Sequence, residues 1–509
     1  MPETDGDGEP RTGVLSDAAV MAGARRLRAI SWSLEIGIAL IVVGSVVAIG
    51  SVHPWAYVPL WIASLLSGAL LGLRAVAIRS LRRVLEGRRF SFHPSGRWLA
   101  LDAQSSYGLT GWTFDLSRPI FPRACLLRPG LVFLTWVAFQ LVPLPFDGRP
   151  VSVSPLDTLR GALFLAAALL VHVAAAAVLD QREARERFRR VVAGLGLLIS
   201  LVAILQLGAG ARRIYGLFEP QEPGLIFGPF VNRNHFAGYM LMVVPTCLAL
   251  LAHAWRRYDE RVGEAPNPRR RLLALTSVQG TELLYAAIPV SVGISALIAT
   301  TSRGALTAFA ASLALAALGL RRRDRGVPVW AIALAFVAMA VSWFGLERLE
   351  IRFENAAADA PGRTLVWRDA LHRMDGRWLR GTGFNAFASA MSGAVPWQLP
   401  LGAEAWPSEI EEARREGRTA GTRVAEGVPG LTWYREAHND YLQVLVETGL
   451  VGLVLALWGA AEVLATARRD PWLIMAMSGV LMHSTVDFDL QIPAVGVLFV
   501  VLAASRVRS

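Results

Sequence analysis

Long apolar segments dominate this chain and limit it to the folds that a membrane allows. Hydrophobic residues make up 54% of the 509 positions and charged residues only 18%, whereas soluble domains are typically about a quarter charged. The apolar residues lie in runs of about 17–25, each long enough to cross a hydrocarbon core of roughly 30 Å. Lipid offers the backbone no hydrogen-bond partners, so such runs must be helical. We therefore predict an all-α polytopic integral membrane protein.

The apolar runs predict about 12 transmembrane helices. They lie near residues 32–51, 54–77, 129–144, 159–179, 191–208, 236–255, 282–300, 304–320, 328–345, 441–461, 471–486 and 490–505. The first run lacks a clear small-residue cleavage site, so we interpret it as a retained span rather than a signal peptide. Residues 1–30 begin with an acidic, polar stretch and are expected to form a disordered cytoplasmic N-terminus.

Arginine clusters predict the orientation of these helices. The chain has a net charge of +11 and contains no lysine, so its positive charge is all arginine. The arginines gather beside alternate span ends, at residues 25–28, 79–89, 182–190, 256–271, 321–325, 468–469 and 506–508. The positive-inside rule places these clusters, and both termini, in the cytoplasm. This distribution does not favour nucleic-acid binding, because the clusters are short and separated by apolar runs.

The same topology divides the chain into four regions. Residues 1–30 precede helices one to nine, which occupy 31–346. One large extracytoplasmic loop with short helices follows at 347–437. Residues 438–509 hold the last helices and a short cytoplasmic tail. The only cysteines, Cys125 and Cys247, lie far apart, so neither a disulfide nor a metal site is expected.

The most informative motif is EAHNDYLQVLVETGLVGLVLAL, residues 436–457, which places His438 directly before an expected span. The positive end of a helix dipole disfavours imidazolium, so this ring should be able to accept a proton. Asn439 or Asp440 is a candidate helix cap. The alternative is a histidine that only caps the helix or hydrogen-bonds the loop, which is the better interpretation of a lone histidine.

Two further motifs lie on the same predicted face. FGPFVNRNHFAGY, residues 227–239, places Asn232, Arg233 and Asn234 before an apolar helix, where free N–H groups can bind an anion. A helix cap beside an interfacial arginine is an equally good interpretation. TTSRGALTAF, residues 300–309, holds Arg303 in a turn between two spans, where an arginine is usually functional or paired. Its alternative is an arginine that snorkels to the interface.

Two weaker patterns complete the set. Arg363 and Trp367 are four residues apart and would share one helix face, an arrangement more often found on a solvated surface. Asp487 and Asp489 form an Asp-Phe-Asp pattern, which many nucleotide-sugar transferases use to bind a divalent metal. Because three letters recur by chance, we predict no metal there. We expect alanine at either aspartate to preserve most activity.

Taken together, these motifs resemble the O-antigen ligase and polymerase family. The matching segments, in order, are LVPLP (141–145), GPFVNRNHFAGY, TSRGAL, RTLVWRDAL with GTGFNAF, HNDYLQVLVETGLVGL and HSTVDFDLQIPA. The resemblance runs from about residue 130 to the end of the chain and depends on the order and spacing of the set. Residues 90–128 carry no such likeness.

The resemblance implies a glycosyltransferase-C-like helical fold in the bacterial inner membrane. It also implies transfer of a glycan from undecaprenyl diphosphate to an acceptor hydroxyl, inverting and without a metal or other cofactor, on the periplasmic face. His438 resembles the catalytic histidine of the family, and Arg303 and Arg363 resemble the arginines that hold the diphosphate. Asn232 and Asn234 match a family motif, whereas Arg233, Trp367, Asn439 and Asp440 are our own candidate substrate contacts.

These residue types suit the implied chemistry. Arginine offers a planar fork to phosphate oxygens and keeps its charge, so two arginines can replace a metal at a departing diphosphate. A neutral histidine is a suitable base for the acceptor hydroxyl. The acceptor stays open between lipid A core, a growing glycan and a protein hydroxyl. Flippase and chain-length regulator proteins are candidate partners alongside the bilayer itself.

Two other classes of protein also have many apolar spans. A transporter or flippase would place ionisable or broken-helix sites near the bilayer midplane, whereas here the polar motifs gather at one face. A receptor with a ligand-binding outer loop would leave Arg303 and His438 unexplained. The sequence therefore favours a membrane glycosyltransferase over both.

The predicted topology can be tested directly. Single cysteines at Gly417 and Arg323, in a background without the two native cysteines, should react with a membrane-impermeant thiol reagent from opposite sides of the membrane. The positive-inside rule places position 323 in the cytoplasm and position 417 outside. Labelling of both positions from the same side would contradict the topology and the shared active face.

Overall fold

The computed structural model describes residues 14–85, 99–100, 113–114, 120, 124–145, 148–220, 226–262, 269, 273–321, 364, 366–391 and 434–505. Within them the long elements are helices, as predicted. They are α1 (Val14–Val47), α2 (Pro54–Leu85), α3 (Leu127–Gln140), α4 (Pro155–Val178), α5 (Arg182–Gly208), α6 (Arg233–Val262), α8 (Val278–Ala299), α9 (Arg303–Arg321), α13 (Phe387–Met391), α15 (Asp440–Ala467), α16 (Pro471–His483) and α17 (Pro493–Ala504).

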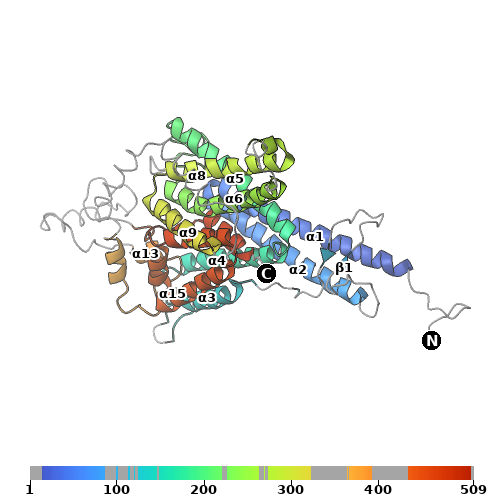
Figure 1. Cartoon of the computed structure of the whole chain (residues 1–509). Helices are drawn as coiled ribbons and strands as arrows, with labels where there is room; N and C mark the ends of the chain where they lie inside the picture. The colour runs from blue at the N-terminus through green and yellow to red at the C-terminus, as the bar shows by residue number, and fades with distance from the viewer. Residues whose placement is uncertain are drawn as a thin grey trace, which may run out of the picture.

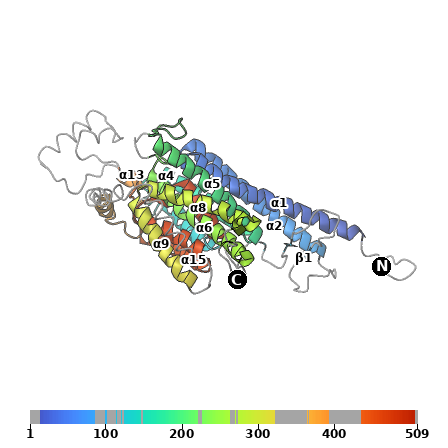
Figure 2. The same ribbon diagram turned by 45° about the horizontal axis from the view of Figure 1, so that its top comes forward.

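The remaining elements are short. Three single 3₁₀ turns lie at Ile49–Ser51, Ala274–Thr276 and Asp489–Gln491. The two-residue strands β1 (Leu99–Ala100) and β2 (Thr113–Phe114) pair antiparallel, near the end of α2 in Figure 1. The architecture is therefore a helical bundle (Figures 1 and 2).

The bundle is that of a polytopic membrane protein. By length and composition, 7 of its described helices could cross a membrane, namely α1, α2, α4, α5, α6, α8 and α15. Shorter apolar helices lie at Arg303–Leu318, Pro471–His483 and Pro493–Ala504. The expected span at 328–345 and most of the expected loop at 347–437 lie outside the described residues. The count of about 12 spans and the loop therefore stay predictions.

The N-terminal segment differs from what we expected. Helix α1 begins at Val14, within the stretch 1–30 that was predicted to be disordered. The reason is tertiary packing: Ala24 and Leu27 are buried against α2, and a Cβ at Gly23 would lie 3.0 Å from Leu81. At 1.5 Å per residue α1 is about 50 Å long. Accordingly, α1 and α2 run side by side and project beyond the bundle in both views (Figures 1 and 2).

Helix α6 lies at the centre of the bundle. In the most apolar 18-residue stretch of α6, 94% is buried inside the protein. In the other candidate spans the corresponding share is 28–50%. It packs on α5, α8 and α16, so its surface faces protein and not lipid. We call the end of the bundle where α6, α9 and α15 begin the outer end. The first turn of α6 is thereby placed in the middle of the outer end.

Helix α15 is broken near its first third. Gly449 has φ 68° and ψ −174°, a conformation that is essentially restricted to glycine. Residues 377–383 lie against the break: Leu450 N–H donates to Trp378 O at 2.8 Å, and Gly383 N–H donates to Glu447 O at 2.8 Å. A broken helix in a membrane protein needs such partners, because lipid cannot satisfy its free backbone groups. The break therefore anchors residues 377–383 to the outer half of α15.

Gly449→Ala should destabilise the protein. A side chain would collide with the carbonyl of Leu379 and require a disfavoured backbone conformation, which alone costs on the order of 1–3 kcal/mol. Thermal unfolding in detergent should show a lowered Tm. The control is Gly194→Ala in α5, where a Cβ meets nothing within 4 Å and alanine should stabilise the helix by roughly 0.5–1 kcal/mol. Equal Tm values for both variants would contradict this account of the break.

Candidate active site

Histidines and aspartates gather at the outer end of the bundle. They come from the first turn of α6, the start of α15, the end of α16 and the connection to α17. We call this group the His–Asp cluster, and its members are His235, His438, Asp440, His483, Asp487 and Asp489. Segments more than 200 residues apart in sequence thus meet at one place. In Figure 1 the outer end carries α13 and lies opposite the N-terminus.

His438 is the exposed member of the cluster, with 38% of its side chain accessible. Its Nδ1 lies 3.6 Å from Oδ1 of Asp487, and its ring stands edge-on to Phe488 with centroids 5.0 Å apart. A separation of 3.6 Å is longer than a hydrogen bond, but catalytic contacts often shorten when substrate binds. With Nδ1 turned to Asp487, Nε2 is the nitrogen available to a substrate.

The backbone of His438 is held in an unusual conformation. Its φ is 51°, in the left-handed region that non-glycine residues rarely adopt. The flanking residues fix it there: Trp367 Nε1 donates to Ala437 O at 2.8 Å, and Ala437 N–H donates to Gln443 Oε1 at 2.9 Å. On the other side, Asn439 Oδ1 accepts from Leu442 N–H at 3.0 Å and caps α15. These hydrogen bonds on both sides of His438 therefore fix the direction of its imidazole.

Asp487 is a buried carboxylate placed between two imidazoles. Its side chain is 1% exposed, and Oδ1 lies 3.7 Å from His235 Nε2 on one side and 3.6 Å from His438 Nδ1 on the other. Burial would raise the pKa of Asp487, but the imidazoles of His235 and His438 and the charge of His483 outweigh it. The pKa is held well below its ordinary value. Asp487 is thus a fixed negative charge behind His438.

A second pair, His483 with Asp489, lies beneath the first. His483 Nδ1 and Asp489 Oδ2 are in direct contact, and both side chains are at most 1% exposed. Two glycines make room for them. A Cβ at Gly238 would collide with the Asp489 carboxylate, and a Cβ at Gly304 would lie 3.1 Å from Cδ2 of His483. Burial raises the pKa of Asp489, although His483 opposes that rise.

The other predicted contacts occupy different roles. Asp440 is buried and accepts from Leu490 N–H at 3.1 Å and Gln491 Nε2 at 3.2 Å, so it holds the α16–α17 connection and does not face a substrate. Asn439 caps α15, as one interpretation of the motif predicted. Trp367 donates a hydrogen bond to the carbonyl of Ala437, the residue before His438. The expectation that Asp440 and Trp367 contact substrate directly is therefore not supported by their geometry.

The anion-binding candidates lie at helix starts. Arg303 is the first residue of α9 and is half-buried, next to Gly304, which packs on His483. Arg233 begins α6, and Asn232 Oδ1 accepts from Asn234 N–H at 2.9 Å, so Asn232 caps that helix. Arg363 lies outside the described residues. The structure thus brings Arg303 and the start of α6 to the His–Asp cluster, and the role of each stays a prediction.

Sequence reasoning missed His235 and misjudged Asp487. His235 follows the asparagines of the motif at residues 227–239, but a single histidine there did not reveal a partner 252 residues away. Asp487 and Asp489 were considered only as metal ligands and were expected to tolerate alanine. Their burial against histidines argues against tolerance of alanine, because a buried histidine would lose its partner.

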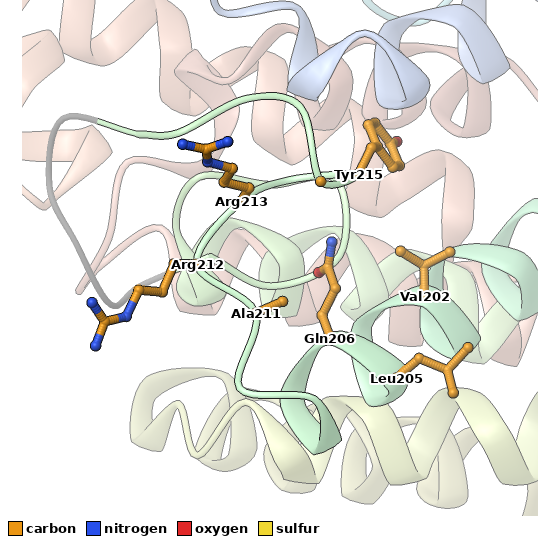
Figure 3. A pocket seen from close by; sticks show the side chains of 8 residues that line it. Val202, Leu205, Gln206, Ala211, Arg212, Arg213 and Tyr215 are labelled. Atoms are coloured by element: carbon orange, nitrogen blue, oxygen red, sulfur yellow. The ribbon is translucent and has the colours of Figure 1, made fainter.

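An open pocket lies elsewhere among the described helices. It has a volume of about 450 Å³ and is lined by Val202, Leu205, Gln206, Ala211, Arg212, Arg213, Tyr215 and Gly216. In Figure 3 the Gln206 amide points toward the loop at 211–216, while the Arg212 and Arg213 side chains point away from it. The pocket shares no residue with the His–Asp cluster. Within the described part of the chain, no three His, Cys, Asp or Glu side chains are arranged to hold a metal ion.

The fold and the cluster define a polytopic membrane protein whose polar chemistry is assembled at one end of its helices. Residues 288–457, about a third of the chain, match the family model of the O-antigen ligases. The resemblance drawn from the motifs is thereby confirmed, and the chain is in general terms a membrane glycosyltransferase of the O-antigen ligase type. No curated protein and no solved structure matches the chain. The matched segment contains Arg303, Arg363 and His438 and ends before His483 and Asp487.

Asp487→Asn should lower transfer by roughly 10- to 100-fold, the usual loss when a carboxylate that orients a functional imidazole is removed. Because the folded-state pKa of Asp487 is lowered, its charge is complete above about pH 3.9 and is lost only as the pH falls through the lowered value. A decline in rate between about pH 7 and 5 should therefore reflect an imidazole and persist in the variant. The measurement is a pH–rate profile.

The matched control is Asp157→Asn, at the outer start of α4 and in contact with Ser154 and Arg160. It should transfer at nearly the normal rate. Wild-type rates for Asp487→Asn would show that His438 does not depend on this carboxylate.

Proposed function

We propose that the protein transfers a glycan from an undecaprenyl diphosphate carrier to an acceptor hydroxyl, with inversion and without a metal ion. The observation that carries the proposal is the exposed His438 imidazole backed by the buried, ionised Asp487. Such a pair is suited to accept a proton from a hydroxyl and to stabilise the imidazolium that results. The family match supports the same class of reaction.

His438 Nε2 takes the proton of the acceptor hydroxyl while its oxygen bonds to the anomeric carbon of the donor sugar. The bond between that carbon and the diphosphate oxygen breaks, and its electron pair leaves with the diphosphate. Attack from the face opposite the leaving group inverts the anomeric centre. The Asp487 carboxylate stabilises the imidazolium, which then loses its proton to water.

The arginines would stabilise the departing diphosphate. Arg303 begins α9 beside the His–Asp cluster, where its guanidinium and the free N–H groups of a helix start favour an anion. Arg363 joins it in the proposal by motif, and Arg233, Asn232 and Asn234 start the neighbouring helix α6. Two guanidinium groups can then neutralise charge that other transferases assign to a divalent ion.

The proposed setting is the bacterial inner membrane, with both termini cytoplasmic, about 12 spans in a glycosyltransferase-C-like bundle, and the active face extracytoplasmic. The described helices support this sidedness. The cluster lies at one end, whereas the opposite end carries the ion pairs Arg187–Glu35 at 2.7 Å and Arg189–Asp470 at 2.6 Å. The arginine-rich end is the one that the positive-inside rule assigns to the cytoplasm.

His438→Ala should reduce transfer from a purified lipid-linked donor by about 10²- to 10⁴-fold, the usual contribution of a general base. Folding should survive, because the side chain is 38% exposed, and donor binding should survive because the arginines carry it. The assay is turnover measured beside donor binding, with His372→Ala, an exposed histidine of the preceding segment, as the matched control.

A His438→Ala protein that binds donor and transfers at the normal rate would falsify the base assignment. The same assay in the presence of a chelator should proceed unchanged. A loss of transfer that a divalent cation restores would instead overturn the metal-independent mechanism.

A further inference from the structure

A second polar group adjoins His438 on its N-terminal side. Gln443 Nε2 donates to Glu436 Oε2 at 2.6 Å and to Gln491 Oε1 at 2.7 Å. The orientation of the Gln443 amide is settled by its oxygen, which accepts from Ala437 N–H. Glu436 and Gln491 are therefore hydrogen-bonded to one nitrogen and lie side by side. The same nitrogen also lies 3.2 Å from Oε1 of the buried Glu447, so its two hydrogens serve three acceptors.

The two side chains keep unused hydrogen-bonding capacity. Within the described residues, the hydrogen bond to Glu436 reaches only Oε2, which leaves Oε1 as an acceptor. Gln491 Nε2 donates to Asp440 at 3.2 Å, which uses one of its two N–H groups. Gln491 is exposed, and Glu436 is partly accessible. The surface therefore presents an acceptor next to a donor.

This surface is continuous with the proposed catalytic residues. Glu436 is two residues from His438, and its carboxylate interacts electrostatically with both His438 and His235. Phe488, half-buried, packs edge-on against both of those rings, at 4.5 Å from His235 and 5.0 Å from His438. Beneath it, the buried His235 Nε2 makes no hydrogen bond shorter than its 3.7 Å contact with Asp487. An apolar ring, a carboxylate, an amide and an imidazole thus border one another.

We propose that Glu436 and Gln491 form the subsite for the acceptor and that this acceptor is a sugar. The inference rests on the proposed transfer reaction. Adjacent hydroxyls on a pyranose ring each donate and accept hydrogen bonds, so one can donate to Glu436 Oε1 while its neighbour accepts from Gln491. The apolar C–H face of the ring lies against Phe488. A third hydroxyl then meets Nε2 of His438.

The arrangement favours a sugar over a protein hydroxyl. A serine or threonine brings one hydroxyl, which the base alone would engage, so no further hydroxyl reaches Oε1 of Glu436 or the second N–H of Gln491. Sites built to hydrogen-bond a particular group discriminate strongly against ligands that lack it. Of the acceptors that the sequence left open, lipid A core and a growing glycan carry the adjacent hydroxyls that fit the subsite, and a serine or threonine side chain does not.

The test is steady-state transfer by the full-length protein from an undecaprenyl diphosphate-linked oligosaccharide. The acceptors are a lipid A-core glycolipid, a free oligosaccharide of the donor repeat unit and a serine-containing peptide. Glu436→Ala and Gln491→Ala should each raise the KM for the sugar acceptor, by about 10- to 100-fold for the charged residue. The KM for the donor should stay unchanged. Glu219→Ala, an exposed glutamate paired with Arg213, is the matched control.

Each outcome decides one question. A raised acceptor KM in both variants supports the subsite, whereas a fall in kcat at unchanged acceptor KM shows that Glu436 only positions His438 and overturns it. Because Gln491 is exposed, its variant decides the matter even where Glu436→Ala fails to fold. Transfer to the peptide in preference to both sugars also overturns the inference while leaving the transfer reaction intact. A wild-type protein that transfers to none of the acceptors overturns the proposed function itself.

Discussion

A carboxylate removed from water has to be paired, and the pairing of Asp487 organises the outer end of this protein. An isolated buried charge is prohibitively costly, so the connection after α16 can hold Asp487 inside only if imidazoles approach it. His235 arrives from α6 and His438 from the start of α15, each within 3.7 Å of the same oxygen. The need to pair Asp487 therefore fixes the relative positions of α6, α15 and α16. Removing the Asp487 carboxylate would leave the buried His235 imidazole without its charged partner.

The strain at His438 is tolerated because independent contacts determine its neighbours. The break of α15 at Gly449 anchors residues 377–383, and buried Glu447 then accepts from Asn385 N–H at 2.8 Å and Phe387 N–H at 3.2 Å. Gln443, one turn before Glu447 on the same helix, holds the backbone of Ala437. A chain of hydrogen bonds thus runs from the helix break to the exposed imidazole. Pre-organisation of this kind keeps a base aligned before substrate arrives.

Helix starts supply the rest of the site. The first turns of α6, α9 and α15 converge at the outer end, and each offers backbone N–H groups with a partial positive charge. A diphosphate has the complementary charge, which makes this end the natural place for a lipid-linked anion. The pocket beside Gln206 lies instead at the C-terminal end of α5, where the helix dipole presents partial negative charge.

The sequence alone determined what depends on local pattern. The bilayer sets the length of a span, so the apolar runs identified each described membrane helix, and the polar residues before a run identified Asn439 as a cap. The family motifs pointed to His438, Arg303 and Arg363 in the same way, although Arg363 lies outside the described residues. These features could be predicted because each is encoded within about 20 neighbouring residues.

Tertiary structure alone decided which side chains meet. His235 and Asp487 are 252 residues apart and Asp440 and Leu490 are 50 apart, and no local pattern records such contacts. Packing also decided that α1 begins at Val14, that Asp440 is buried and structural, and that Gln443 joins Glu436 to Gln491. Whether a polar residue binds a substrate or its own fold depends on burial and partners, which arise only when distant helices pack together.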